Sequence, residues 1–568
     1  MDTPQPETFA FETYARRSTN YLNRMVDRDG LPYFNVFWTD PPEAAHDWPD
    51  FGDVMSRQYQ AAIMARRMTG EEAPIERVWR AKLMGLIDPE SGLLYRPKTR
   101  YSEHVADMGD QALTLYALVT AYADQPDEQL AQVIRRMVDT LLTRTRTAAI
   151  DGGGFLSGFI IKSLMACARA LDCAPALELA GLLVRRVFVE QPLFTPDNAF
   201  RHGGHMHGNL RTLVGAADYA LYTSDPVLFS RVDALYRYVR SEATRFGFLP
   251  EAIGRQADIV ACETCALMDY LGLAVTLANH GHPEYWGDVE RAARNHLVEN
   301  QVVDGSWLNA VTDRPDTDQF TWREIGDRMV GGYAGWSSPT HILAARETLN
   351  AHWGGPELRD KTRAFQNCCG GSGTHAFFTA WKNAARFEDG QLTVNLHVDK
   401  SLPQAEVRCL QPYRGELRIA LRQDCRVRVR IPEFAVAGSM QVEADGAPVE
   451  SCSWGNLLEI GPRRAGETIR VAYPQPETGE EIRIGVPGFR QYRYWVVWKG
   501  DTVVDVQPLD MDAATGYSDF DKRDVPIFYG DRGPCRLYRR SHVLQDVEPA
   551  PTRIHLDGGG LDFWHLGR

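Results

Sequence analysis

The chain has 568 residues, more than one hydrophobic core usually organises, so we expect about two to four domains. Its 44% hydrophobic and 24% charged residues are typical of a globular protein, and its net charge of -13 argues against nucleic acid or an anionic membrane as the main partner. No apolar run approaches the roughly 18 residues of a membrane span, and the start MDTPQPETFAFETYARRS lacks the pattern of a signal peptide, so we expect a cytoplasmic protein with reduced thiols.

Residues 1–388 are predicted to be mostly helical. Apolar residues recur at helical spacing, and the periodic segments end near Gly, Asp or Pro. Many such helices joined by short breaks favour a helical bundle, a solenoid or an (α/α)6 toroid. The predicted helices are QYQAAIMARRMTG (58–70), 110–123, 130–145, 159–172, 209–225, TCALMDYLGLAVTLANHG (264–281) and GTHAFFTAWKNAARF (373–387).

From residue 389 the pattern changes to short strands. QLTVNLHVD, GELRIALRQ, CRVRVRIPEF, MQVEADG, NLLEIG and ETIRVAYP alternate apolar and polar residues between Gly, Pro, Asp and Asn. This predicts a β-sandwich over 389–480. The run YRYWVVWKGDTVVDVQPL (492–509) predicts a second small β module or a return segment over 481–568. The fold class is therefore multidomain α+β.

Two loops before predicted helices carry carboxylates and aromatic groups. HDWPDFGDVMSRQ (46–58) contains Trp48 and Asp53, and YSEHVADMGDQ (101–111) contains Asp110. Such side chains bind sugars through hydrogen bonds and ring stacking. An aspartate before a helix also caps its free N–H groups, and for Asp53 and Asp110 capping is an equal alternative.

Histidines and glycines gather in RHGGHMHGN (201–209), with His202, His205 and His207 at the start of a predicted helix. They could hydrogen-bond sugar hydroxyls, hold a metal, or cap the helix. The loop GGYAGWSSPTH (331–341) is rich in Gly and aromatic residues, and Trp336 is predicted to line a cleft or to be buried in a connector.

The most specific feature is the pairing of ACETC (261–265) with QNCCGGSGTH (366–375). Zinc favours thiolate, imidazole and carboxylate ligands, usually four in a tetrahedron, and Glu263, Cys265, Cys368 and Cys369 would supply them. Residues two apart on a helix point about 200° apart, so Glu263 and Cys265 can share an ion only at a helix start. The adjacent cysteines are expected to need an irregular turn, which the following glycines permit.

Other interpretations of the cysteines remain open. Most isolated cysteines are small buried side chains, and the vicinal pair could form a redox disulfide. The cysteines assigned to the apolar interior are Cys167, Cys173, Cys409, Cys425, Cys452 and Cys535.

Together the E-T-C and C-C-G-G motifs resemble the β-L-arabinofuranosidase family, glycoside hydrolase family 127 and its relatives. Further similar stretches are GHMHGNLRTLVGAADYALYTSD (204–225), FGFLPEAIG (246–254), HPEYWGDVERAARNHLVENQ (282–301) and VNLHVDKSLPQAEV (394–407). The resemblance implies an N-terminal (α/α)6 toroid followed by β-sandwiches. By motif position it implies Glu263, Cys265 and Cys369 as Zn²⁺ ligands and Cys368 as both ligand and nucleophile.

The resemblance also implies an acid/base glutamate shortly upstream of E-T-C. Glu251 in GFLPEAIG matches best, although its 12-residue separation from Glu263 is shorter than the family pattern, and Glu242 is the alternative. His205 matches a family sugar contact. The family has a histidine close to Asp110, so this departure alters the expected substrate contacts.

The leading hypothesis is a zinc-dependent, retaining exo-glycosidase acting on a terminal furanoside such as β-L-arabinofuranose. A thiolate nucleophile and a carboxylic acid suffice for this chemistry. The alternatives are a sugar isomerase or epimerase on the same toroid, and a non-catalytic carbohydrate-binding protein with a structural zinc. The expected partner is a carbohydrate substrate, with the β domains as candidates for a homodimer contact.

Overall fold

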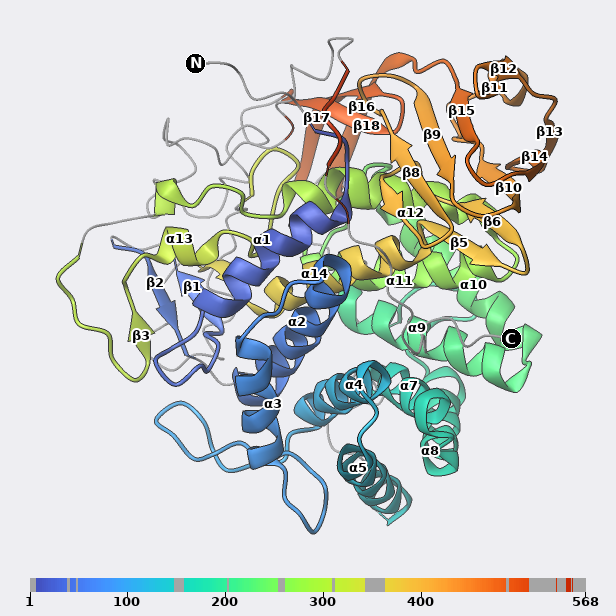
Figure 1. Ribbon diagram of the computed structural model, residues 1–568. Coiled ribbons are helices and arrows are strands. Elements are labelled where there is room, and N and C mark those ends of the chain that lie inside the picture. The colour runs from blue at the N-terminus through green and yellow to red at the C-terminus, as the bar shows by residue number, and fades with distance from the viewer. Residues whose placement is uncertain are drawn as a thin grey trace.

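A computed structural model describes residues 7–37, 41–46, 50–147, 158–201, 204–253, 261–308, 312–342, 363–486, 490–509, 538, 548–552 and 554. Figure 1 shows the helices as the larger part of the molecule and the orange strands gathered above them. None of the described helices is long and apolar enough to cross a membrane.

The helices form a double ring. In the inner ring each helix packs against the next, and contact between the last and the first closes the circle. The inner helices are α2 (Met55–Thr69), α4 (Met108–Asp124), α7 (Ile161–Leu171), α9 (Met206–Thr223), α11 (Thr264–Asn279) and α14 (Cys368–Asn383). The outer helices are α1 (Phe11–Arg24), α3 (Ile75–Leu86), α5 (Glu128–Thr147), α8 (Ala174–Arg185), α10 (Pro226–Glu242) and α12 (Trp286–Ala292). This confirms the predicted (α/α)6 toroid.

Short helical turns complete this part of the chain. Helix α13 (Ile325–Met329) packs on α1. The π-helical turns are η1 (Asp50–Val54), η2 (Arg186–Glu190) and η5 (Ala293–Leu297), and the 3-10 turns are η4 (Pro283–Tyr285), η6 (Ser306–Leu308) and η8 (Ala437–Ser439), the last between strands. Turn η1 leads directly into α2, so Asp53 in the turn lies close to Arg57 in the first turn of the helix.

A small antiparallel sheet that the periodicity did not predict lies at one end of the toroid. Its strands are ordered β3 (Phe320–Thr321), β2 (Glu43–Ala45), β1 (Asn35–Phe37) and β4 (Arg363–Gln366). Strand β4 runs into α14, and the backbone N–H of Asn367 donates to the carbonyl of Phe34 at 2.7 Å. The sheet thereby anchors the start of α14.

His46, directly after β2, is a buried imidazole between two carboxylates. Its Nε2 lies 3.1 Å from Asp27 Oδ2, and its Nδ1 lies 3.2 Å from Asp50 Oδ2. Burial alone disfavours the charged ring, but the two carboxylates outweigh it and raise the pKa of His46 to about 9.

The stability of the protein is therefore expected to depend on pH through His46. Since the folded pKa exceeds the ordinary value of about 6.5, the stabilisation is complete below pH ~6.5 and is lost as the pH rises towards 9, by up to about 3 kcal/mol. The thermal unfolding midpoint of the wild type should fall over this range more steeply than that of His46→Gln. Equal slopes for the two proteins would contradict the assignment.

The strands after α14 form two packed sheets, as predicted for a β-sandwich. One sheet has the order β13 (Cys452–Trp454), β14 (Leu457–Arg463), β10 (Cys425–Arg430), β6 (Gln391–Val394) and β5 (Ala385–Glu388). The other has the order β12 (Ala447–Pro448), β11 (Gln441–Ala444), β15 (Thr468–Ala472), β9 (Glu416–Leu421), β8 (Ala405–Cys409) and β7 (Lys400–Ser401). Apolar side chains of both sheets form one core, separate from the core of the toroid.

A third, antiparallel sheet consists of β16 (Glu477–Val486), β17 (Arg490–Lys499) and β18 (Thr502–Pro508). Most of its buried apolar residues, among them Tyr494, Trp498 and Val503, belong to the hydrophobic core of the toroid, while Val504 packs with Tyr413. The sheet is therefore packed on the helical ring.

Two expectations about local structure were wrong. Helix α14 begins at Cys368, five residues before the predicted start at 373, because the glycines that suggested a turn lie inside the helix. Cys452 is exposed on β13 rather than buried, while Cys535 lies outside the described residues.

Candidate functional site

Backbone hydrogen bonds between loops hold Glu251 at one end of the toroid. The backbone N–H of Glu251 donates to the carbonyl of Ala261 at 2.8 Å, and the N–H of Met206 donates to the carbonyl of Glu251 at 2.7 Å. Gly204 permits this arrangement, since a Cβ there would lie 1.6 Å from the carbonyl oxygen of Ile253. The ladder places Glu251 beside the starts of α9 and α11.

The two cysteine motifs converge at this place. Glu263, Cys265, Cys368 and Cys369 are all buried, and each offers a ligand atom within 4.8 Å of the others. Cys265 Sγ lies 3.7 Å from Cys368 Sγ and 3.4 Å from Cys369 Sγ. Both separations exceed the length of a disulfide bond. Cys368 and Cys369 are also free thiols, so the structure does not contain the vicinal disulfide considered above.

Helix starts explain the convergence. Glu263 is the N-cap of α11 and Cys265 lies in its first turn, as the spacing predicted. The expectation of an irregular turn at the cysteine pair was wrong, because Cys368 and Cys369 open α14. Partial positive charge at both helix starts favours thiolates.

The glycines after the cysteine pair allow α14 to approach its neighbours closely. A Cβ at Gly370 would lie 2.4 Å from the ring of Tyr21 on α1, and a Cβ at Gly371 would lie 2.7 Å from the backbone of Arg57 on α2. These glycines therefore bring the two thiols against the first turns of the adjacent inner helix.

Cys368 differs from the other two thiols. It is 6% exposed, whereas Cys265 and Cys369 are 0% exposed. Hydrogen bonds from Cys265 and Cys369, aided by the Arg57 guanidinium, lower the pKa of Cys368 to about 6. Burial raises the pKa of Cys265 and Cys369 well above the usual value. Cys368 is thus the least completely buried of the three cysteines and the one whose thiol most readily carries negative charge.

A second group shares Glu263. His205, Glu251 and Glu263 offer ligand atoms within 4.8 Å of one another, and His205 Nε2 lies 3.4 Å from Glu263 Oε2 and 3.9 Å from Glu251 Oε1. Burial opposes the charge of Glu263, but His205 outweighs it and holds the pKa of Glu263 at about 2. His205 also caps α9, so the capping and site interpretations both apply. Its side chain is 35% exposed.

Trp336 is buried rather than at the mouth of the toroid. Its indole Nε1 donates a hydrogen bond to Glu251 Oε2 at 2.8 Å, and the residue is 0% exposed. The indole therefore positions the Glu251 carboxylate and does not present a stacking face to a sugar.

A buried ion network that the sequence patterns did not predict lies behind the thiols. Asp269 accepts from Lys162 Nζ at 3.0 Å and lies 2.8 Å from His207 Nδ1, while His207 Nε2 lies 3.1 Å from Arg57 Nη1. Arg57 Nη1 in turn donates to Cys265 Sγ at 3.9 Å. Both ring nitrogens of His207 are thus engaged within the protein. The spacing in the sequence could have revealed Asp269, since it follows Cys265 by one turn of α11 and therefore lies on the same face of that helix.

The two predicted aspartates occupy different environments. Asp53 lies in η1, pairs with Arg57 and keeps 27% of its side chain exposed. Asp110 is buried inside the first turn of α4 and pairs with Arg96, while the N-cap is Asp107. The prediction that Asp110 caps the helix was therefore wrong. Glu242 is the exposed last residue of α10, and His202 and Trp48 lie outside the described residues.

The donor set fits a soft divalent metal. Three thiols and one carboxylate lie close enough together to surround one ion, and the set contains the sulfur-rich mixture that zinc prefers. The buried cluster could therefore hold a metal ion.

Solved structures share this fold across most of the chain. One, described as a glycoside hydrolase, is 14% identical, with a TM-score of 0.59 over 88% of this chain and 83% of its own. A GH127 β-L-arabinofuranosidase from Geobacillus stearothermophilus T6 is 14% identical, with a TM-score of 0.54 over 86% and 80%. A GH127 β-arabinofuranosidase is 15% identical, with a TM-score of 0.57 over 87% and 81%. No protein-family model and no curated protein sequence matches the chain.

Proposed function

We propose that this protein is a zinc-dependent, retaining exo-glycosidase, a distant member of the glycoside hydrolase family 127 group. One observation carries the proposal: Glu263 belongs both to the buried thiol cluster and to the group with Glu251 and His205. A nucleophile and a carboxylic acid are thereby gathered at one end of the toroid, which is the pair that retaining hydrolysis requires.

Glu263, Cys265, Cys368 and Cys369 would hold the zinc ion. When bound, zinc keeps coordinating sulfur in the thiolate form at neutral pH. A fully liganded zinc site is often structural. Here the neighbouring group of Glu251 and His205, which shares Glu263 with the thiol cluster, favours a catalytic role, because a structural site does not need a second carboxylate beside it.

The reaction is assigned to two side chains. Cys368 Sγ attacks the anomeric carbon as the bond to the leaving oxygen breaks, and Glu251 transfers its proton to that oxygen. Glu251 then removes a proton from water, the water oxygen bonds to the anomeric carbon, and Cys368 leaves as thiolate. Two displacements at the same carbon retain its configuration.

Neighbouring groups position these two residues. The Trp336 indole holds one oxygen of Glu251, and His205 lies between Glu251 and Glu263 at the exposed edge. Asp53 and His205 are the partly exposed polar groups here, so they are proposed to hydrogen-bond the sugar. His207 and Trp336 are not proposed to contact the sugar. His207 acts by positioning Arg57, and Trp336 acts by positioning Glu251.

The proposed substrate is a terminal furanoside, with β-L-arabinofuranose as the first sugar to test. Two solved structures with this fold are described as a β-L-arabinofuranosidase and a β-arabinofuranosidase. Close to the place where the family carries a histidine, this chain has Asp110, which is buried and paired with Arg96. Because this difference can change which sugar fits, related pentofuranosides are the next substrates to test.

Glu251→Gln tests the assignment of the acid/base. We expect kcat/KM to fall by about 10²- to 10⁴-fold on substrates with poor leaving groups, because glutamine cannot supply a proton. Aryl glycosides with acidic phenols should lose much less in the first step, since they leave without protonation. The measurement is a series of aryl arabinofuranosides with graded phenol pKa.

Glu242→Gln is the matched control and should leave all rates unchanged. An equal loss across the leaving-group series, or inversion of the anomeric centre seen by NMR of the first product, would refute the proposed mechanism. Hydrolysis of no glycoside in the panel by the metal-loaded wild type would refute the function itself.

A further inference from the structure

A cavity of about 450 Å³ lies between the helical ring and the β-sandwich, and it shares no lining residue with the thiol site. Ala278 on α11 and Trp286 on α12 form its helical side, and residues of β5, β6, β10 and β14 form the other. Pro283 and Glu388, which also line it, are exposed, so the cavity is open to solvent. Its volume lies within the range of about 300–1,000 Å³ typical of small-molecule sites.

Polar side chains of three neighbouring strands meet on the sheet face that lines this cavity. Arg386 on β5 is opposite Thr393 on β6, and Thr393 is opposite Arg428 on β10. Successive side chains of a strand point to opposite faces, and the adjacent residues Leu392 and Val427 belong to the core of the sandwich. The two arginines therefore lie about 10 Å apart, measured between their Cα atoms, on the face turned towards the helices.

Two donors of this face have no partner in the part of the chain that the structure describes. Arg386 makes neither a hydrogen bond nor an ion pair there, and its Nε is buried. The amide Nε2 of Gln391 on β6 is likewise buried without a hydrogen-bond partner. Burial lowers the pKa of Arg386, and the nearby charge of Glu388 offsets this effect only in part. Because burying an unpaired charge is costly, an anion that pairs with Arg386 would be bound favourably.

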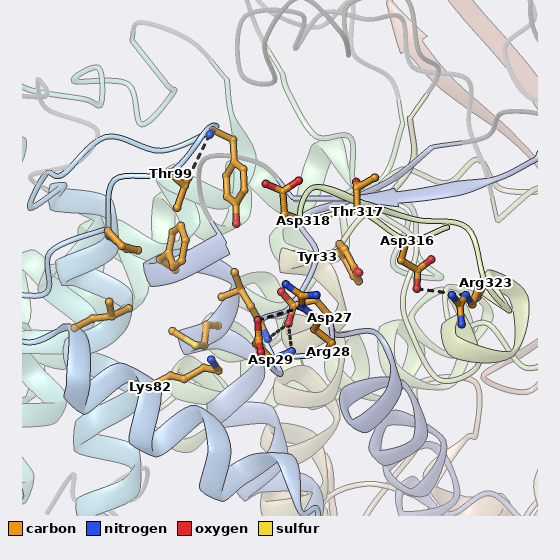
Figure 2. Close-up of a pocket in the computed structure, with 16 residues that line it drawn as sticks. Asp27, Arg28, Asp29, Tyr33, Lys82, Thr99, Asp316, Thr317, Asp318 and Arg323 are labelled. Carbon is orange, nitrogen blue, oxygen red and sulfur yellow. Dashed lines mark hydrogen bonds and ion pairs between the residues drawn. The ribbon is translucent and has the colours of Figure 1, made fainter. Parts of the chain in front are cut away.

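Another cavity of the protein lacks this property. Figure 2 shows it, and four aspartates there outnumber the three basic side chains, Arg28, Lys82 and Arg323. Arg323 already lies 3.6 Å from Asp316. The excess of carboxylates repels an anion, so the cavity at Arg386 is the better anion site of the two.

The lining of the Arg386 cavity selects a single negative charge on a polar molecule. A guanidinium binds both oxygens of a carboxylate through two parallel hydrogen bonds. The carboxylates of Glu388 and Asp389 also line the cavity and would repel a dianion such as phosphate. Hydroxyl oxygens of a ligand can accept from the Gln391 amide and the Thr393 hydroxyl. A sugar that carries one carboxylate combines these groups.

We propose that this cavity binds a uronate, a sugar with one carboxylate group. The carboxylate pairs with the Arg386 guanidinium, and hydroxyl groups of the sugar contact Gln391 and Thr393. The cavity is separate from Cys368 and Glu251, so the inference does not depend on the proposed function. It gives the protein a second, non-catalytic site for acidic carbohydrate.

Calorimetry with D-galacturonate and D-galactose tests the requirement for charge, because the two sugars differ only in the carboxylate. The wild type should bind galacturonate with a Kd of about 1 mM or lower, and galactose and acetate at least about tenfold more weakly. Arg386→Gln should weaken galacturonate binding at least about tenfold, and Gln391→Ala about threefold or more. Arg426→Gln is the matched control, since Arg426 is exposed on β10 and does not line the cavity, and it should bind like the wild type.

A thermal shift assay shows whether the variants are folded. Arg386→Gln should unfold at or above the wild-type temperature, because it removes an unpaired charge, and galacturonate should raise only the wild-type midpoint. Arg386→Lys, which keeps the charge without the planar fork, should recover part of the binding. Hydrolysis of an aryl glycoside should be equal for the wild type and Arg386→Gln, so the two proposals are tested separately.

Three results would overturn the inference. The first is a wild type that binds neither galacturonate nor D-glucuronate at about 10 mM. The second is equal affinity for galacturonate and galactose, or for galacturonate and acetate, because the site would then not require both the charge and the sugar. The third is folded Arg386→Gln that binds galacturonate as tightly as the wild type does.

Discussion

Cys368→Ser is expected to lower kcat/KM on an aryl arabinofuranoside by at least about 10³-fold while the protein stays folded. A serine hydroxyl is not ionised near neutral pH, so the attacking electron pair is lost although the side chain is nearly the same size. Cys368 is only slightly exposed at the start of α14, and an Oγ can still accept the contacts of its neighbours. The circular dichroism spectrum should therefore be unchanged.

Trapping distinguishes loss of the nucleophile from loss of metal. With a slowly released aryl glycoside, intact mass spectrometry should show one added glycosyl group on the wild type and none on Cys368→Ser. Cys452→Ser, on the exposed strand β13, is the control and should label and turn over like the wild type. Substantial turnover by Cys368→Ser, with metal still bound, would show that another group attacks the sugar.

Removal of the metal is expected to lower kcat/KM almost as much as Cys368→Ser does. Dialysis against a strong chelator should release about one zinc ion per chain and lower kcat/KM by at least about 10²-fold, and added zinc should restore it. The unfolding midpoint should also fall by several degrees, because the metal binds only the folded chain and stabilises it by mass action. Four buried candidate ligands at one place would account for both effects.

Glu263→Gln is the matched variant for the metal. Its amide has no negative charge for the ion and leaves the neighbouring His205 without its carboxylate, so zinc content and activity should fall together. Glu284→Gln, on the short turn η4, should retain both. Elemental analysis with a thermal shift assay provides the measurements. Full activity after complete removal of the metal would mean that the ion, if bound, has a structural role only.

Local patterns in the sequence were sufficient for most of the architecture. Apolar spacing predicted the helices that became α2, α4, α5, α7, α9 and α11, and alternation predicted the strands of the sandwich. Both patterns reflect which side chains an element buries, which is a property of neighbouring residues. The four candidate ligands were likewise identified from the sequence, because glutamate and cysteine are residue types that zinc favours.

The tertiary structure decided what those residues meet. Glu251 owes its orientation to the Trp336 indole from a distant loop, and Arg57 owes its place to His207 and Asp269 on two other helices. The glycines of α14 also changed meaning, since they serve close approach to α1 and α2 rather than a turn.

The sequence by itself thus determined the inner helices, the strands of the sandwich and the identity of the candidate ligands, since each depends on residue type and short-range spacing. The choice of a toroid over a bundle or a solenoid came from the family resemblance. Only the tertiary structure brought Glu251, Glu263 and Cys368 to one end of the ring. Closure of that ring depends on contact between α14 and α2, which lie at opposite ends of the helical region, and no local pattern encodes that contact.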